Sequence, residues 1–238
     1  MSDDQTVSEY SLLLAGEDVR LLPERALFWV RAATLIIADP HIGKASAFRA
    51  ASIAVPEGTT TADLDRLSRI IARCNAQKVI VLGDLLHARS GRTAATIAAF
   101  AAWRERYADL DLFLVRGNHD ARAGDPPDVW GVACVDEPWH LPPFILRHYP
   151  AAHTSGYTLA GHLHPAVRLT SAGRQRVTLP CFWFGAQVGV LPAFSSFTGA
   201  TVITPEPNDQ VFVIADDEVV AVSGASHGTA PAPRGWRR

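Results

Sequence analysis

The chain has 238 residues, of which 48% are hydrophobic and 19% charged, and its formal net charge at pH 7 is −2. This composition is apolar enough to build a buried core, which excludes a disordered, collagen-like or acidic-tail protein. We expect one domain over residues 11–223, between a flexible N-terminus at residues 1–10 and a flexible Gly- and Pro-rich tail at residues 224–238.

Several features of the chain favour a cytoplasmic location without membrane contact. No stretch reaches the roughly 18 uninterrupted apolar residues of a membrane span. Residues 1–10 carry acidic but no basic side chains, unlike a secretory signal. Cys74, Cys134 and Cys181 are an odd number without a C-x-x-C pair, as in proteins whose thiols stay reduced.

In the first half, predicted strands and helices alternate. Strands are expected at residues 12–15, 19–30 (interrupted at Pro23), 34–38, 79–82 and 112–115. One helix is expected to begin near residues 59–61, where a threonine could cap it, and to bury Leu64, Leu67, Ile71 and Cys74. A second is expected at residues 93–107, with Ile97, Phe100 and Tyr107 facing inward. This alternation predicts a parallel sheet whose ligands bind at the C-terminal ends of its strands.

From Val132 onward helical periodicity is lost and short strands predominate. They are expected at residues 144–147, 157–160, 166–169, 176–179, 201–203 and 211–214. The second half is therefore predicted to be mainly β.

Oxygen- and nitrogen-bearing side chains follow the predicted strands. The motifs are Asp39-Pro40-His41, Gly83-Asp84, Gly117-Asn118-His119-Asp120 and Gly161-His162-Leu163-His164, with His148 as a fifth point. In an extended segment, residues two apart face the same way, so Asp39 and His41 can contact one ion together, and His162 and His164 can contact a shared site. The spacing thus predicts a cluster of metal ligands.

The donor types indicate which ions would bind. Carboxylate, amide and imidazole groups without thiolate favour manganese, iron or zinc at a hydrolytic centre. Two such ions about 3.5–4 Å apart can hold the oxygens of a phosphoryl group during its transfer. Phosphoester hydrolysis is the chemistry that this cluster suits.

These four motifs, in this order, resemble the calcineurin-like metallophosphoesterase superfamily. A closer resemblance is to its ligase-associated DNA damage response endonuclease branch, through residues 22–29 (LPERALFW), 83–89 (GDLLHAR), 180–185 (PCFWFG) and 191–194 (LPAF). The resemblance covers roughly residues 10–220. One departure is Pro40, which stands where the branch usually has leucine; we expect its side chain to point away from the metals and both neighbouring ligands to be kept.

The resemblance implies a fold and a set of roles. The fold is a four-layer αββα sandwich of two mixed β-sheets flanked by helices. The ligands of the first metal would be Asp39, His41 and His164, those of the second Asn118, His148 and His162, with Asp84 bridging. His119 would give a hydrogen bond or proton to the leaving oxygen, with Asp120 as its orienting partner. The cofactors implied are two divalent ions, manganese first, with iron or zinc as alternatives.

The activity that the resemblance implies is that of a manganese-dependent DNA endonuclease and phosphodiesterase. It would act on single-stranded DNA in repair, beside a ligase, a helicase and an exonuclease. Two alternatives stay open: a phosphoesterase for a nucleotide or another small phosphodiester, and a non-catalytic metal-bound interaction module. A homodimer also stays open, because aromatic segments of the second half suit either a buried sheet or a subunit contact.

Some residues near the motifs have two interpretations. We prefer His148 as ligand over His140 and His153, because it directly follows a predicted strand, and we expect His140, His153 and His227 to be structural. His87 is equally compatible with supporting the site or contacting substrate and with polar filling.

Arginines and aromatic side chains also lie close to the motifs. The arginines beside the motif loops are Arg89, Arg92, Arg116, Arg122 and Arg147. Each alone is expected to be a solvated surface residue, but at least one should contact substrate phosphate. The run Phe182-Trp183-Phe184 is expected in the core or an interface rather than stacking on bases, and Cys181 is not expected to act as a nucleophile.

Overall fold

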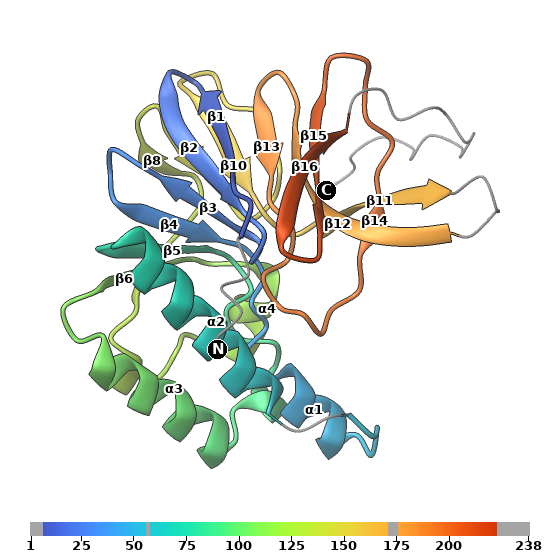
Figure 1. The fold of residues 1–238 in the computed structure, drawn as a ribbon. Coiled ribbons are helices and arrows are strands. Elements are labelled where there is room, and N and C mark those ends of the chain that lie inside the picture. Colours follow the sequence, from blue (N-terminus) through green and yellow to red (C-terminus); the bar gives the residue numbers. More distant parts are fainter. Residues whose placement is uncertain (1–6, 56–57, 171–175, 223–238) are drawn as a thin grey trace, which may run out of the picture.

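The computed structural model describes residues 7–55, 58–170 and 176–222. In Figure 1 two β-sheets pack against each other, and the longer helices lie on one side of the pair. The first sheet has seven strands that are neighbours in chain order. They are β1 (Tyr10–Leu14), β2 (Glu17–Leu22), β3 (Ala26–Trp29), β4 (Thr34–Ile37), β5 (Lys78–Leu82), β6 (Asp111–Val115) and β7 (Ala133–Val135). Pairing is antiparallel from β1 to β4 and parallel from β4 to β7.

The second sheet is built from the rest of the chain. Its strands are β8 (Trp139–Leu141), β9 (Phe144–Leu146), β10 (Tyr157–Ala160), β11 (Pro165–Thr170), β12 (Arg176–Phe184), β13 (Val188–Val190), β14 (Thr201–Val202), β15 (Gln210–Ala215) and β16 (Glu218–Val222). Their order is β14-β11-β12-β13-β10-β9-β8, with β15 between β12 and β16. Because β9, β10 and β13 are parallel to one another, β9 and β10 end at the same edge.

The helices are α1 (Lys44–Ala50), α2 (Thr59–Cys74), α3 (Ala94–Arg106) and α4 (Asn118–Ala123), with 3-10 turns η1 (Arg89–Gly91) and η2 (Asp128–Trp130). The predicted apolar face of α2 is buried as expected. Its cap differs from the expectation, since Gly58 precedes the helix in a left-handed conformation and no threonine hydroxyl caps it. At the start of α3, the Thr93 side chain accepts from Thr96 N.

Apolar residues form two main cores on opposite faces of the first sheet. Leu35 and Val79 face α2 and α3, while Ile36 and Ile80 face the second sheet. Within α3, Phe100 is buried as predicted, but the most buried side chain is Trp103, which the sequence interpretation did not select. On β12, Phe182 and Phe184 enter the core between the sheets, as expected.

The predicted α/β class with two mixed sheets and flanking helices is confirmed. The prediction omitted α1, α4 and four short or terminal strands, β7, β8, β13 and β16. Three of these strands, β7, β8 and β13, have only three residues each, too few to show a period of two in the sequence. The segments expected to be flexible, residues 1–10 and 224–238, fall largely outside the described residues, although Tyr10 lies in β1. Within the described part of the chain, no helix is both long and apolar enough to cross a membrane.

Candidate metal centre

The predicted donor residues come from the ends of five strands in the two sheets. Asp39 and His41 follow β4, Asp84 follows β5, and Asn118 opens α4 after β6. His148 follows β9, and His162 and His164 follow β10. Parallel strands end at a common edge of each sheet, and the packing of the two sheets brings these edges together.

The first cluster consists of Asp39, His41 and His164. One potential ligand atom from each lies within 4.8 Å of the others. His41 Nε2 is 3.4 Å from His164 Nε2, which is 3.6 Å from Asp39 Oδ1. This grouping matches the first ligand set that the family resemblance implied.

The second cluster consists of Asp84, His148 and His162, with ligand atoms inside the same 4.8 Å limit. His148 Nε2 lies 2.8 Å from Asn118 Oδ1, 3.0 Å from His162 Nδ1 and 3.5 Å from Asp84 Oδ1. The clusters adjoin, because His148 Nδ1 is 3.7 Å from Asp39 Oδ1. All seven expected ligands are thus brought to one place.

The tautomers of two histidines test whether a cation fits. His148 Nδ1 lies 3.1 Å from the Leu82 carbonyl, and His164 Nδ1 lies 3.0 Å from the Gly199 carbonyl. A carbonyl only accepts, so each Nδ1 carries the proton and each Nε2 presents a lone pair to its cluster. Asp39 Oδ1 is buried there without a hydrogen-bond partner. Nitrogen and oxygen acceptors that face one another in this way suit a divalent cation.

The pKa shifts of the buried His41 and Asp84 also bear on whether a cation fits this site. Burial, reinforced by the positive charge of Lys44, lowers the pKa of His41 to about 2, so this ring is neutral and able to ligate. Burial, together with the charge of Asp39 and against that of His148, raises the pKa of Asp84 to about 6. Burial acts to lower the pKa of His164, but the hydrogen bond and negative charge of Asp39 outweigh it and raise this pKa above its ordinary value.

The carboxylates also hold the loops of the site together. Asp39 Oδ2 accepts from the His162 backbone N–H, and Asp84 Oδ1 accepts from that of His119, each at 2.8 Å. Close packing at the first of these contacts requires a glycine. A Cβ on Gly161 would lie 2.6 Å from Asp39 Oδ2 and 2.8 Å from the Ala38 Cβ.

The backbone of the site is strained. Five donor residues lie in the left-handed region, namely Asp39 (φ 51°), His41 (47°), Asp84 (53°), His162 (70°) and His164 (48°). This conformation costs a non-glycine residue roughly 1–2 kcal/mol. Such strain persists where surrounding contacts enforce it, and it is concentrated at functional sites.

His119 stands beside the second cluster with its side chain 31% exposed. Its Nδ1 is 2.7 Å from the His87 backbone oxygen, and its Nε2 is 3.9 Å from Asp84 Oδ2. The expectation that Asp120 orients His119 is wrong. Asp120 is buried, and its carboxylate accepts from Leu86 N and Gly117 N, both at 3.0 Å, so it joins the Asp84 loop to the His119 loop.

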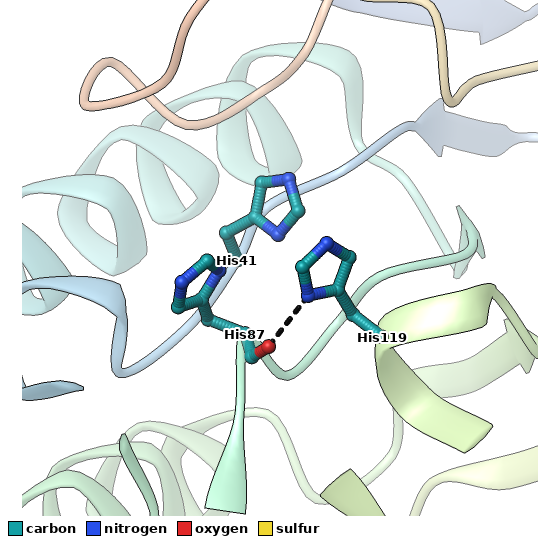
Figure 2. Close-up of side chains that lie close together, drawn as sticks. All are labelled: His41, His87 and His119. Atoms are coloured by element: carbon teal, nitrogen blue, oxygen red, sulfur yellow. Dashed lines mark hydrogen bonds between the residues drawn. The ribbon is translucent and has the colours of Figure 1, made fainter. Parts of the chain in front are cut away.

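His87 belongs to the site neighbourhood, which the sequence left undecided. Figure 2 shows its ring beside those of His41 and His119, and a potential ligand atom from each lies within 4.8 Å of the others. Its ring stacks between those of Phe48 and His119, with centroids 5.9 Å and 5.0 Å away. Burial and the charge of Lys44 lower the pKa of His87 to about 4, so the ring is neutral at physiological pH.

The sequence interpretation did not assign Lys44 to the site. Lys44 is half-buried at the start of α1 and donates to Thr198 Oγ1 at 2.9 Å. The available signal was its position three residues after His41, together with the scarcity of lysine in this chain. The positive charge of Lys44 helps to lower the pKa of both His41 and His87.

The remaining histidines and Pro40 have other places. His140 and His153 pack against each other, with ring centroids 4.9 Å apart, outside the clusters. His227 lies outside the described residues. Pro40 lines a small apolar cavity beneath α2 together with Leu64 and Phe194.

Three of the five arginines near the motifs are bonded to the protein itself. Arg89 donates to the Arg122 carbonyl, Arg92 donates to three backbone oxygens, and Arg116 pairs with Asp125 and Asp136. Arg122 is exposed. Arg147 is half-buried and lines a pocket beside His162.

Comparison with known proteins gave two kinds of match. Residues 33–184 match a family model described as calcineurin-like phosphoesterase. The crystal structure of Pseudomonas putida nuclease MPE is 40% identical, with a TM-score of 0.79 over 90% of this chain and 100% of the other. Yfce, a phosphoesterase from E. coli, is 16% identical, with a TM-score of 0.38 over 80% of this chain and 92% of the other. No curated protein sequence matched.

Proposed function

This chain belongs to the calcineurin-like phosphoesterase family, and on that basis we propose that it is a manganese-dependent endonuclease that cleaves single-stranded DNA. Family membership and the similarity to a nuclease support a metal-dependent phosphoesterase. DNA as substrate, manganese as the native ion and a role in repair are the proposal's additions.

The observation that carries the proposal is the pair of adjoining donor clusters. Asp39, His41 and His164 would hold one ion. The groups that would hold the other are Asn118, His148 and His162, with Asp84 shared between the two ions. Divalent cations bound there would supply positive charge that draws electrons from phosphodiester oxygens. Oxygen and imidazole ligands without thiolate are compatible with manganese.

His119 supplies the proton in this proposal. Its Nδ1–H is engaged by the His87 carbonyl, so Nε2 is the ring atom that faces the clusters. When this ring is an imidazolium, Nε2 can donate its proton to the leaving oxygen as the P–O bond breaks, and His119 is left neutral. The His87 carbonyl orients the ring through this step.

DNA is proposed as substrate because the similar Pseudomonas putida protein is a nuclease. We place this activity in DNA repair beside a ligase, a helicase and an exonuclease, following the resemblance of the sequence to the ligase-associated branch. Since the chain carries a net charge of −2, local contacts to phosphate rather than a strongly basic surface would hold the strand.

Closed circular single-stranded DNA with manganese tests this function, because a circle has no ends and only internal cleavage makes it linear. His119→Ala serves as the contamination control, and His140→Ala replaces a histidine outside the clusters as the matched control. We expect wild type and His140→Ala to linearise the circle and His119→Ala to leave it closed. Cleavage should fall steeply with salt, because phosphate contacts release counterions.

A different result would redirect the assignment. An intact circle together with hydrolysis of a small phosphodiester would overturn DNA as substrate and support the nucleotide alternative. Metal binding without hydrolysis of either substrate would support a non-catalytic module.

A further inference from the structure

A pocket of about 1010 Å³ opens beside the second cluster, on the outer face of the second sheet. It shares His162 with the cluster, and Tyr149 and Leu163 continue its wall from the same loops. Trp183 closes another side from β12, where it faces away from the core that contains Phe182 and Phe184. Cavities of about this size hold small molecules, and this one is continuous with the candidate metal centre.

Two aromatic residues in its wall are held by partly buried carboxylates. Trp183 Nε1 donates to Asp209 Oδ2 at 2.6 Å. The backbone N–H groups of His148 and Tyr149 donate to Glu137 Oε2 at 2.7 and 3.1 Å. These carboxylates are therefore engaged in positioning the wall. The Tyr149 ring packs against that of His162 with centroids 4.4 Å apart, yet the residue is 42% exposed.

One cation at the pocket has unused hydrogen-bonding capacity. Arg147 Nε is buried without a hydrogen-bond partner, and its nearest carboxylate oxygen, Glu137 Oε2, is 3.8 Å away. This distance is too long for a hydrogen bond. By contrast, Arg92 and Arg116 are satisfied by other protein groups. The Arg147 side chain is 22% exposed, so its terminal guanidinium nitrogens can donate to an anionic oxygen that enters the pocket.

We propose that this pocket binds the nucleoside next to the cleaved phosphodiester, with its base stacked on Tyr149 and an adjacent phosphate on Arg147. The inference rests on the proposed function, because a phosphate at the two clusters places its own nucleoside beside His162. An aromatic wall suits the neutral face of a base, and Arg147 suits the charged backbone. Stacking on a single ring accepts every base, so the pocket confers a preference for nucleic acid without sequence specificity.

Binding without metal tests the pocket independently of catalysis. The probes are fluorescent oligothymidylate and an abasic strand of equal length, measured by anisotropy in EDTA. Stacking of one base is worth about 1–3 kcal/mol, so the wild type should bind oligothymidylate about 5–150-fold more tightly. Tyr149→Ala should lose this preference and Tyr149→Phe should keep it. Arg147→Gln should weaken binding of both strands and reduce the salt slope by about one.

A second variant, which fills the pocket with a larger side chain, keeps the test valid if Tyr149→Ala disturbs the neighbouring His162. Ala152 is exposed and lines the pocket, so Ala152→Trp should occupy the space with the fold intact. It should abolish the preference for oligothymidylate while its melting temperature stays that of the wild type. An unchanged preference in both Tyr149→Ala and Ala152→Trp would overturn the proposal, as would a dimer that these substitutions convert to monomer.

Two small esters separate failure of the pocket from failure of the proposed function. Thymidine 5′-(4-nitrophenyl phosphate) carries a base, and methyl 4-nitrophenyl phosphate does not. We expect the manganese-loaded wild type to prefer the thymidine ester and Ala152→Trp to lose that preference. Equal hydrolysis of both esters by an enzyme that still linearises circular DNA would overturn the pocket and keep the nuclease. Hydrolysis of neither ester nor DNA would overturn the proposed function itself.

Discussion

His119 Nδ1 lies 2.7 Å from the main-chain oxygen of His87, three residues beyond Asp84. Because the contact is to main chain, the ring is oriented by the path of the loop after β5 rather than by a charged partner. The same loop carries Asp84, so one segment positions both a shared ligand and the proton donor. This geometry keeps Nε2 toward the clusters, where it can donate a proton to the leaving oxygen.

Replacing His119 with alanine should lower kcat on DNA by about 10²–10⁴-fold, the usual contribution of a general acid. A 4-nitrophenyl ester should lose far less, because nitrophenolate leaves without being protonated. Metal content should stay unchanged, since His119 lies outside the two proposed ligand sets. The measurement is kcat on both substrates with metal analysis of the same samples. Equal losses on both would contradict the proton-donor role.

Asp120 should matter for stability. Its carboxylate is buried and accepts two backbone N–H groups, from Leu86 and Gly117. Asp120→Ala leaves both donors unsatisfied and should reduce the free energy of unfolding by on the order of 3 kcal/mol, and Asp120→Asn by less, because one oxygen remains. Urea unfolding of the metal-free proteins measures this. Wild-type stability with selective loss of activity would restore Asp120 as the partner of His119.

Gly161→Ala should disturb the first cluster directly. The added Cβ would lie 2.6 Å from Asp39 Oδ2, so either the carboxylate or the loop after β10 must shift. We expect a loss of stability of about 1–3 kcal/mol and weaker manganese binding. Gly199→Ala is the matched control, since nothing lies within 4 Å of its new methyl group. Calorimetric titration with manganese compares the two; equal affinities would argue against close packing at Asp39.

Glu17, the first residue of β2, should make the stability of the protein depend on pH. Hydrogen bonds from Arg31 and Trp29 lower the pKa of Glu17 below its ordinary value of 4.5. The unfolded chain therefore binds the proton more tightly, and stability falls as acid is added. The contribution is fully present above pH 4.5 and is lost as the pH drops through the lowered pKa. In urea unfolding, wild type and Glu17→Gln should differ most at neutral pH and converge in acid. A constant difference across this range would contradict the assignment.

The sequence predicted the donor residues because each follows a predicted strand. Asp39, Asp84 and Asn118 follow three parallel neighbours, so their proximity could be expected from strand order. The proximity of His148 to Asp39 could not, because it depends on how two separate sheets pack. Nor could composition indicate that Asp39 and His162 adopt positive φ, which surrounding contacts impose.

The wrong assignment of Asp120 has a similar origin. Adjacency to His119 suggested a partner, but on a helical turn consecutive side chains diverge, and Asp120 turns into the protein to bind main chain. The actual partner, a carbonyl at His87, carries no side-chain signal in the sequence. Lys44 was missed for a different reason, since its proximity to the site depends on α1, a helix of only seven residues.

The most direct test of the account is the number of metal ions that the two clusters hold. Metal-free protein would be dialysed against manganese and analysed by mass spectrometry for manganese per chain, with Asp84→Asn and His140→Ala beside the wild type. We predict two ions per chain in the wild type and in His140→Ala. Asp84→Asn should hold one or none, because Asp84 is the proposed shared ligand. A wild type that binds no more than one ion, or an Asp84→Asn variant that keeps two, would contradict the dinuclear centre.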